Sequence, residues 1–160
     1  MKKLFDNFTG KEAIPETLFS YKRENDVLTF EFTAKDSSLT SYSSINNDKL
    51  YDDNAVEIFL DLGDDFYYEF EVAPNGATFI ATILNRNIAF IENNFFEAQS
   101  LIEGNSYHVT MKIDLNKLKI TKTIKFNAFR IERKYGCTLE ALSPTLCDTF
   151  HVRDKFINLD

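Results

Sequence analysis

Hydrophobic and polar positions alternate most regularly between residues 55 and 72. The apolar positions of this alternation are Val56, Ile58, Leu60, Phe66, Tyr68, Phe70 and Val72. The positions between them combine carboxylates with aromatic rings, and they are Glu57, Phe59, Asp61, Tyr67, Glu69 and Glu71. Because successive side chains of a strand point to opposite faces, this pattern predicts two antiparallel strands with one buried face. We interpret the face with the carboxylates as solvent-exposed, as is common for antiparallel sheets.

Similar alternation predicts short strands along most of the chain. A Glu24-Asn25-Asp26 turn and an Asn75-Gly76 turn each predict a hairpin. Two polar stretches, 35–49 and 85–94, are predicted to be loops, and residues 114–118 to form one helical turn. The expected strands cover residues 17–21, 27–34, 55–62, 66–73, 77–84, 95–102, 107–113, 123–132, 138–142 and 156–159.

The apolar set of the stretch 123–132 changes sides along its length. It changes from Ile124 and Phe126 to Phe129 and Ile131, which predicts a bulge or a local bend. The sequence contains no internal repeat and no long amphipathic helix. Together these patterns predict an all-β fold: a single antiparallel β-sandwich domain over residues 1–160, with long connecting loops.

Composition and charge narrow the range of partners. The length of 160 residues suits one domain with a full core, and the formal net charge of -7 argues against binding to a phosphate backbone. In the N-terminal sequence, MKKLFDNFTGKEAIP, Asp6 and Asn7 interrupt the apolar run, and no stretch is long enough to span a membrane. We therefore expect a cytoplasmic protein without nucleic-acid or membrane partners, or an extracellular one if a leader precedes it.

Cys137 and Cys147 lack metal-ligand spacing, so we expect free thiols, or a disulfide in an exported protein.

Signatures of catalysis are absent from the sequence. It contains no glycine-rich phosphate loop, no nucleophile elbow and no zinc-type cluster of His and Cys. Glu57, Glu69 and Glu71 could supply the two carboxylates of a glycosidase, but we favour a non-catalytic interpretation. Oxygen ligands suit Ca²⁺, so calcium is a candidate cofactor although no EF-hand spacing is present. The aspartates that suggest it are Asp52, Asp53, Asp61, Asp64 and Asp65.

Several segments resemble the family 9 and family 9-like carbohydrate-binding domains. LYDDNAVEIFLDLGDDFYYEFEVAPNGATFIA is similar to the central segment of that family, and LTFEFTAKD to the early strand. AFRIER resembles the late strand, LSPT the Trp-Ser-Pro-Thr turn, and FHVRDKF the closing Phe-His-x-Pro-x-x-Phe-Gly element. Leu142 stands in place of the turn's tryptophan, and Arg153 and Ile157 in place of the closing proline and glycine. The resemblance implies a β-sandwich of the DOMON-like type.

The resemblance also implies a set of ligand-binding residues. In sugar-binding members, two aromatic side chains stack on a terminal sugar and charged groups bind its hydroxyls. One aromatic position falls on Tyr51, and the other on Phe150 or its neighbour His151. Glu71 falls where some members have an arginine. The chain contains no tryptophan, so neither aromatic position is filled by one. The residues assigned to ligand binding in this way are Tyr51, Glu57, Glu71, Arg130, Phe150 and His151.

The sequence leaves several functions open. The first is a non-catalytic module that binds a mono- or oligosaccharide. The second is a ligand-less interaction or structural module with a protein partner or in a homo-oligomer. A third is haem binding, because related sandwiches carry haem on a Met and a His, which would be Met111 and His151 here. A glycoside hydrolase accessory is a further alternative. The arrangement of Tyr51 and Phe150, across an open groove or inside the core, distinguishes the first function from the second.

Overall fold

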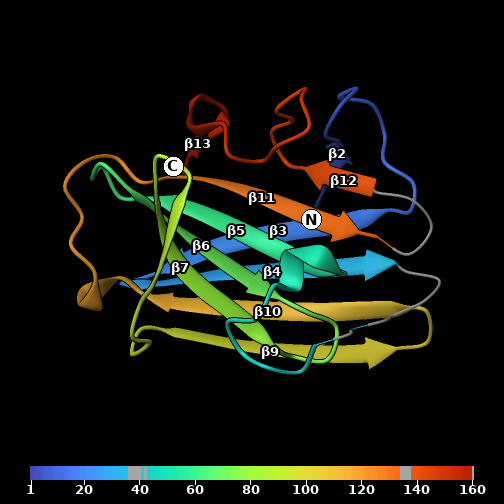
Figure 1. Cartoon of the computed structure of the whole chain (residues 1–160), viewed down its shortest axis with the longest axis horizontal. Coiled ribbons are helices and arrows are strands. Elements are labelled where there is room, and N and C mark those ends of the chain that lie inside the picture. The colour runs from blue at the N-terminus through green and yellow to red at the C-terminus, as the bar shows by residue number, and fades with distance from the viewer. Residues whose placement is uncertain (36–40, 42, 134–137, 160) are drawn as a thin grey trace.

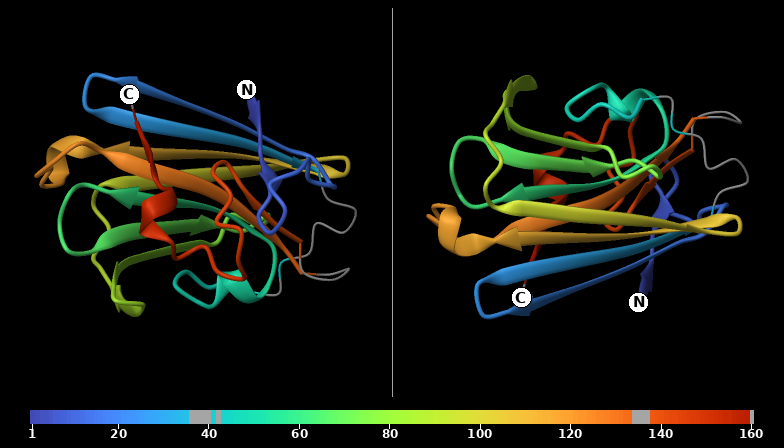
Figure 2. Two further views of the ribbon diagram at one scale, coloured as in Figure 1. Left: turned by 90° about the horizontal axis from the view of Figure 1, so that it is seen from above. Right: turned by 90° about the horizontal axis from the view of Figure 1, so that it is seen from below.

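Antiparallel strands form two sheets in the computed structural model, which describes residues 1–35, 41, 43–133 and 138–159. Figure 2 shows β3 and β4 (blue) and β6 and β7 (green) on opposite sides of the molecule, so the predicted all-β sandwich is confirmed. The first sheet has the order β1 (Lys2–Lys3), β3 (Thr17–Glu24), β4 (Val27–Lys35), β10 (Ser106–Asp114) and β9 (Phe96–Glu103).

The second sheet carries the strands that were most clearly predicted. Figure 1 shows β11, β5, β6 and β7 side by side in it. Its order is β2 (Phe5–Asp6), β12 (Thr138–Ala141), β11 (Lys125–Glu132), β5 (Ala55–Asp61), β6 (Tyr67–Val72), β7 (Thr78–Leu84) and β8 (Asn87–Phe90), with β13 (Ile157–Asn158) paired to β11. The short helical turns are η1 (Leu50–Asp52), η2 (Leu115–Lys117) and η3 (Arg153–Lys155), and no helix of the described residues is long and apolar enough to cross a membrane.

The register of β5 fixes which side chains share a face of the second sheet. Glu57 pairs with Glu71 of β6 on one side and with Phe129 of β11 on the other. Val56 pairs with Val72, one position away, and therefore lies on the opposite face. Even-numbered positions of β5 and β6 pack against the first sheet, and odd-numbered positions face away from it.

The outer, odd-numbered face is buried rather than solvent-exposed, which corrects the prediction from the alternating pattern. The loop that contains η1 and the segment that follows β12 fold back over it and contribute Leu50, Phe150 and Phe156 to a second apolar cluster. Phe59 and Phe129 of the sheet pack into the same cluster. Alternation cannot reveal such a cover, because the covering residues are distant in sequence.

Burial on both faces also explains the change of sides in β11. The pairing with β5 is regular from Lys125 to Ile131, so the predicted bulge is wrong. Phe126 packs between the sheets, whereas Phe129 and Ile131 pack into the outer cluster.

Part of the predicted loop 85–94 is a strand, β8. Leu84 pairs with Asn87, so only Asn85 and Arg86 form the turn. Both have positive φ angles, 49° and 66°, as in the two-residue turns that match the twist of a hairpin. The turn contains no glycine, which is why the sequence did not reveal it.

Candidate functional site

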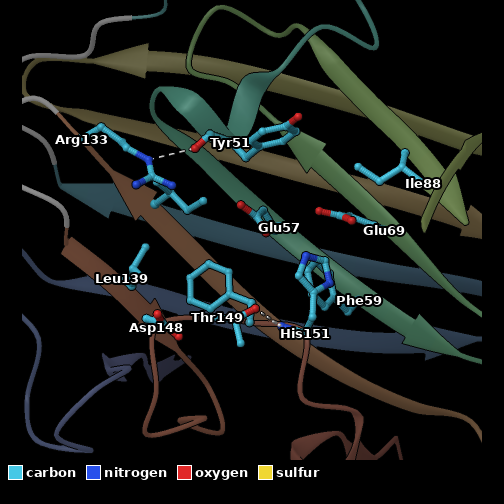
Figure 3. A pocket seen from close by; sticks show the side chains of 12 residues that line it. Tyr51, Glu57, Phe59, Glu69, Ile88, Arg133, Leu139, Asp148, Thr149 and His151 are labelled. Atoms are coloured by element: carbon cyan, nitrogen blue, oxygen red, sulfur yellow. Dashed lines mark hydrogen bonds between the residues drawn. The ribbon is translucent and has the colours of Figure 1, made fainter. Parts of the chain in front are cut away.

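A cavity of about 300 Å³ opens on the outer face of the second sheet. Glu57 of β5 and Glu69 of β6 line it, and Figure 3 shows both between Tyr51 on one side and His151 on the other. Phe150 and Arg133 also line the cavity. The cavity therefore has acidic groups between aromatic walls.

The wall that carries Tyr51 is held by contacts from three directions. Asn46 and Asn47, in the loop before η1, accept hydrogen bonds from the backbone N–H groups of Thr78 and Ile80 in β7, each at 3.0 Å. Arg133 Nε donates to the Tyr51 carbonyl at 2.9 Å (Figure 3). The Tyr51 ring meets Phe79 edge-on, with 5.9 Å between centroids. Tyr51 is half-buried, so part of its ring is available to a ligand.

The opposite wall rests on the rings of the sheet below it. Phe150 stacks on Phe129 with 4.2 Å between centroids and 20° between planes. His151 stacks on Phe59 with 5.0 Å between centroids. Thr145 holds the preceding loop, because its Oγ1 donates to the Thr149 carbonyl at 2.7 Å. These contacts place Phe150 and His151 across the cavity from Tyr51.

His151 and Tyr67 share a short hydrogen bond at this wall. The Tyr67 hydroxyl lies 2.5 Å from His151 Nδ1. Burial, together with the charge of Arg86, lowers the pKa of His151, and burial together with the charge of Glu69 raises the pKa of Tyr67. Both shifts favour the neutral forms, and the tautomer of the neutral imidazole sets whether the hydroxyl donates to Nδ1 or Nδ1–H donates to the phenolic oxygen. His151 is thus a neutral hydrogen-bonding group.

Three carboxylates lie close together on this face. Burial raises the pKa of Glu57 well above its ordinary value, with a further contribution from Glu69 and an opposing one from Arg133. Burial raises the pKa of Glu69 to about 7. Burial and repulsion by both neighbours raise the pKa of Glu71. Burial and mutual repulsion therefore favour protonated carboxyl groups in this cluster as long as it holds no positively charged ligand.

The structure brings four of the six sequence-assigned residues together. Tyr51, Glu57, Phe150 and His151 all line the cavity. Tyr51 packs on Phe79 of β7 and Phe150 on Phe129 of β11, and β5 and β6 lie between these two strands, so Tyr51 and Phe150 lie on opposite sides. Glu71 is adjacent to Glu57 but fully buried, and it is not among the residues that line the cavity.

Arg130 is not at this site, which corrects its assignment. It pairs with Val56 and so lies on the inner face of the second sheet. There it is fully buried, and its Nη1 contacts Glu140 and Thr17, each at 3.2 Å. The arginine at the cavity is Arg133, three positions later and on the face of Phe129 and Ile131. Together with Glu69, Arg133 is a lining residue that the sequence assignment omitted.

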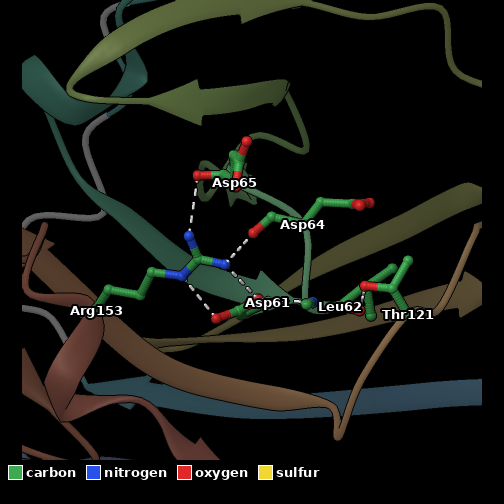
Figure 4. Close-up of polar contacts among 7 residues, drawn as sticks. Asp61, Leu62, Asp64, Asp65, Thr121 and Arg153 are labelled. Atoms are coloured by element: carbon green, nitrogen blue, oxygen red, sulfur yellow. Dashed lines mark hydrogen bonds and ion pairs between the residues drawn. The ribbon is translucent and has the colours of Figure 1, made fainter.

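Three of the five aspartates that suggested calcium, Asp61, Asp64 and Asp65, surround an arginine (Figure 4), and Asp52 and Asp53 lie at η1. Arg153 donates to both carboxylate oxygens of Asp61, and its guanidinium also contacts the backbone carbonyls of Asp64 and Asp65. Within the described residues, these aspartates do not form a group with metal-binding spacing. At three of the five positions, a positive charge from the chain itself therefore balances or contacts the aspartate.

The haem alternative fails on geometry. Met111 is fully buried between the two sheets, whereas His151 packs on Phe59 at the outer face of the second sheet. The second sheet separates the two side chains, so they cannot bind one iron.

Cys147 is a free thiol, and the prediction for Cys137 lies outside the described residues.

Solved structures with the same fold are known, although the sequence matches no family model and no curated protein. A candidate carbohydrate-binding protein from Bacteroides uniformis superposes with a TM-score of 0.82, at 20% identity over 97% of this chain and 83% of that one. A family 9 carbohydrate-binding module from Caldicellulosiruptor kristjanssonii in complex with glucose has a TM-score of 0.65 at 16% identity, over 88% of this chain and 73% of that one. The same kind of module with cellotriose has a TM-score of 0.63 at 17% identity, over 88% and 71%. The chain therefore has the fold of family 9 carbohydrate-binding modules, as the sequence resemblance predicted.

Proposed function

We propose that this chain is a non-catalytic carbohydrate-binding module that holds a terminal sugar between Tyr51 and the Phe150–His151 wall. One observation carries the proposal. One carboxylate oxygen of Glu57 and one of Glu69 are buried without a hydrogen-bond partner, and both residues line a cavity with aromatic side chains on opposite sides. Buried acceptors of this kind are costly unless a ligand supplies donors.

A sugar satisfies both features of the cavity. Its hydroxyl groups donate hydrogen bonds to the carboxylate oxygens, and its apolar C–H faces pack on aromatic rings. Arg133 adds a donor group with fixed geometry at the same wall as Tyr51. The volume of about 300 Å³ lies at the small end of the range for ligand pockets, which favours one sugar unit or a chain end over a long internal segment.

The structural neighbours support the same class of ligand. Two solved structures with this fold, both of a family 9 module from Caldicellulosiruptor kristjanssonii, are complexes with glucose and with cellotriose. Glucose and glucose-terminated oligosaccharides are therefore the first ligands to test.

The test is a calorimetric titration of the whole chain with glucose, cellotriose and a panel of other mono- and oligosaccharides. Tyr51→Ala and Phe150→Ala should each weaken binding at least tenfold, because each removes one wall. Phe8→Ala, an exposed ring outside the cavity, is the matched control and should bind like the wild type. Since Phe150 is buried, Phe150→Leu and a thermal unfolding curve would separate lost binding from lost folding. A folded wild type that binds no saccharide contradicts the proposal.

The proposal also states that the chain does not hydrolyse the saccharide that it binds. Glu57 and Glu69 could be mistaken for a glycosidase pair, since both line the cavity. Cellotriose incubated with the protein should remain intact by NMR. Release of shorter sugars that stops in Glu57→Gln would contradict the non-catalytic assignment.

A further inference from the structure

The carboxylates of Glu57, Glu69 and Glu71 converge on one point of the outer face of the second sheet. One oxygen from each carboxylate lies within 4.8 Å of an oxygen of the other two. Their exposed fractions are 1%, 4% and 0%. Glu57 Oε1, Glu69 Oε2 and both oxygens of Glu71 are buried without a hydrogen-bond partner. Buried carboxylate oxygens that no group of the chain bonds favour a ligand with positive charge at this point of the sheet.

The convergence is built into rigid strands. Glu57 and Glu71 are directly paired across β5 and β6, and Glu69 precedes Glu71 by two positions on the same face. Strand pairing thus fixes the three Cβ positions, unlike an acidic loop whose side chains are free to separate. No lysine, arginine or histidine among the described residues forms an ion pair with any of the three.

We propose that Glu57, Glu69 and Glu71 form a calcium site, each providing one carboxylate oxygen. Ca²⁺ prefers oxygen ligands at about 2.3–2.6 Å, so oxygens on opposite sides of one ion lie up to about 5 Å apart. The separations in the cluster fit within that limit. Mg²⁺, with its shorter bonds of about 2.0–2.1 Å, demands near-ideal octahedral geometry and gives up its water reluctantly, so three carboxylates fixed on strands suit it less well.

The charges of the surroundings also balance with a divalent ion. An ion that binds here displaces the protons that burial favours on the cluster. The three ionised carboxylates then carry three negative charges, and Ca²⁺ neutralises two of them. Arg133 acts electrostatically on Glu57 and supplies the remaining positive charge nearby. A monovalent cation would leave a net negative charge in a buried place, which is more costly.

The cavity provides access and the rest of the coordination shell. Glu57 and Glu69 line it, so an ion can enter from solvent and keep water or ligand oxygens on the cavity side. The site is distinct from the aspartates around Arg153, which lie at the end of β5. Because calcium binding can be measured without sugar, it can succeed or fail independently of the proposed carbohydrate binding.

The test is a titration of the whole, chelator-treated chain with CaCl₂, followed by calorimetry and by thermal unfolding. We expect one ion per chain and a rise in the unfolding temperature. Glu71→Gln and Glu57→Gln keep the side-chain shape and should weaken calcium binding at least tenfold. Asp64→Asn, in the aspartate group, is the control and should bind Ca²⁺ like the wild type.

Three results would overturn the calcium site. One is a wild-type chain whose dissociation constant for Ca²⁺ is weaker than roughly 1 mM, the upper end for extracellular calcium modules. Another is unchanged calcium binding in both glutamine variants, which would place the ion elsewhere. Equal affinity for Mg²⁺ would likewise contradict the assignment to Ca²⁺.

Discussion

Arg153 holds Asp61 by two hydrogen bonds of 2.7 Å, one from Nε and one from Nη2. The contact joins η3, near the C-terminus, to the last residue of β5. It therefore helps to keep the segment with Phe150 and His151 against the outer face of the second sheet.

Arg153→Ala should lower the free energy of unfolding by about 2 kcal/mol near neutral pH, since paired hydrogen bonds to a charged group are lost. Burial alone would raise the pKa of Asp61, but the hydrogen bonds from Arg153 and Gly63 outweigh it and lower that pKa. The stabilisation is thus present above the ordinary pKa of Asp61 and is lost as the pH falls through the lowered one. Urea unfolding should show the variant and the wild type converging in acid. Arg23→Ala, an exposed arginine, is the control, and a difference that persists in acid contradicts this account.

Gly63→Ala should destabilise the chain more than Gly76→Ala. Both glycines have positive φ angles, 100° and 87°, so both substitutions introduce backbone strain of roughly 1 kcal/mol or more. A Cβ on Gly63 would also lie 2.6 Å from Lys122 Cβ and 2.8 Å from Lys122 N, whereas a Cβ on Gly76 meets no atom within 4 Å. We expect the Gly63 variant to lose about 2 kcal/mol more in chemical unfolding. Equal losses would contradict the predicted clash.

His151 should stay neutral at pH values where a solvent-exposed imidazole is protonated. Burial and Arg86 lower its pKa in the folded chain, so the unfolded chain binds a proton more readily. Stability should therefore fall as the pH drops below about 6.5, the ordinary pKa of histidine. NMR titration of the imidazole signals checks the pKa, with His108→Gln to identify the His151 resonances. His151→Gln should lose this part of the pH dependence, and an unchanged slope would contradict the assignment.

Glu140→Gln should become more stable relative to the wild type as the pH rises. Burial raises the pKa of Glu140 to about 7, although Arg130 opposes the shift. The folded chain thus binds a proton that the unfolded chain releases from about pH 4.5 upwards, and the wild type loses stability up to about pH 7. Unfolding curves at about pH 5 and pH 8 measure the change, with the exposed Glu31→Gln as control. Parallel curves for variant and wild type would show that Glu140 keeps its ordinary pKa.

The sheet strands could be predicted from the sequence because the alternation of apolar and polar residues that reveals a strand lies within the strand itself. Leu28, Phe30 and Phe32 alternate with polar neighbours, and all three are buried between the sheets in β4. The cover over Glu57 and Glu69 could not be predicted in the same way. It depends on residues 50 and 150, which only the fold brings near each other.

The sequence did contain a signal that separates Arg133 from Arg130. Phe129 and Ile131 share a face, so the residue two positions further on, Arg133, belongs to that face and Arg130 to the other. The apparent change of sides in β11 obscured this alternation, because a strand buried on both faces shows no polar side. Once Phe129 is known to pair with Glu57, the assignment of Arg133 follows.

The contacts of Asn46 and Asn47 with β7 have a consequence for solubility. β8 pairs only with residues 81–84, so Thr78 and Ile80 would otherwise present open backbone donors at a sheet edge. Asn46 and Asn47 accept hydrogen bonds from those two N–H groups, and Asn47 N–H donates to the Thr78 carbonyl at 2.8 Å. An open edge is a template for pairing with a strand of another molecule. The two asparagines thus protect the chain against edge-to-edge aggregation at the same place where they hold the loop that leads to Tyr51.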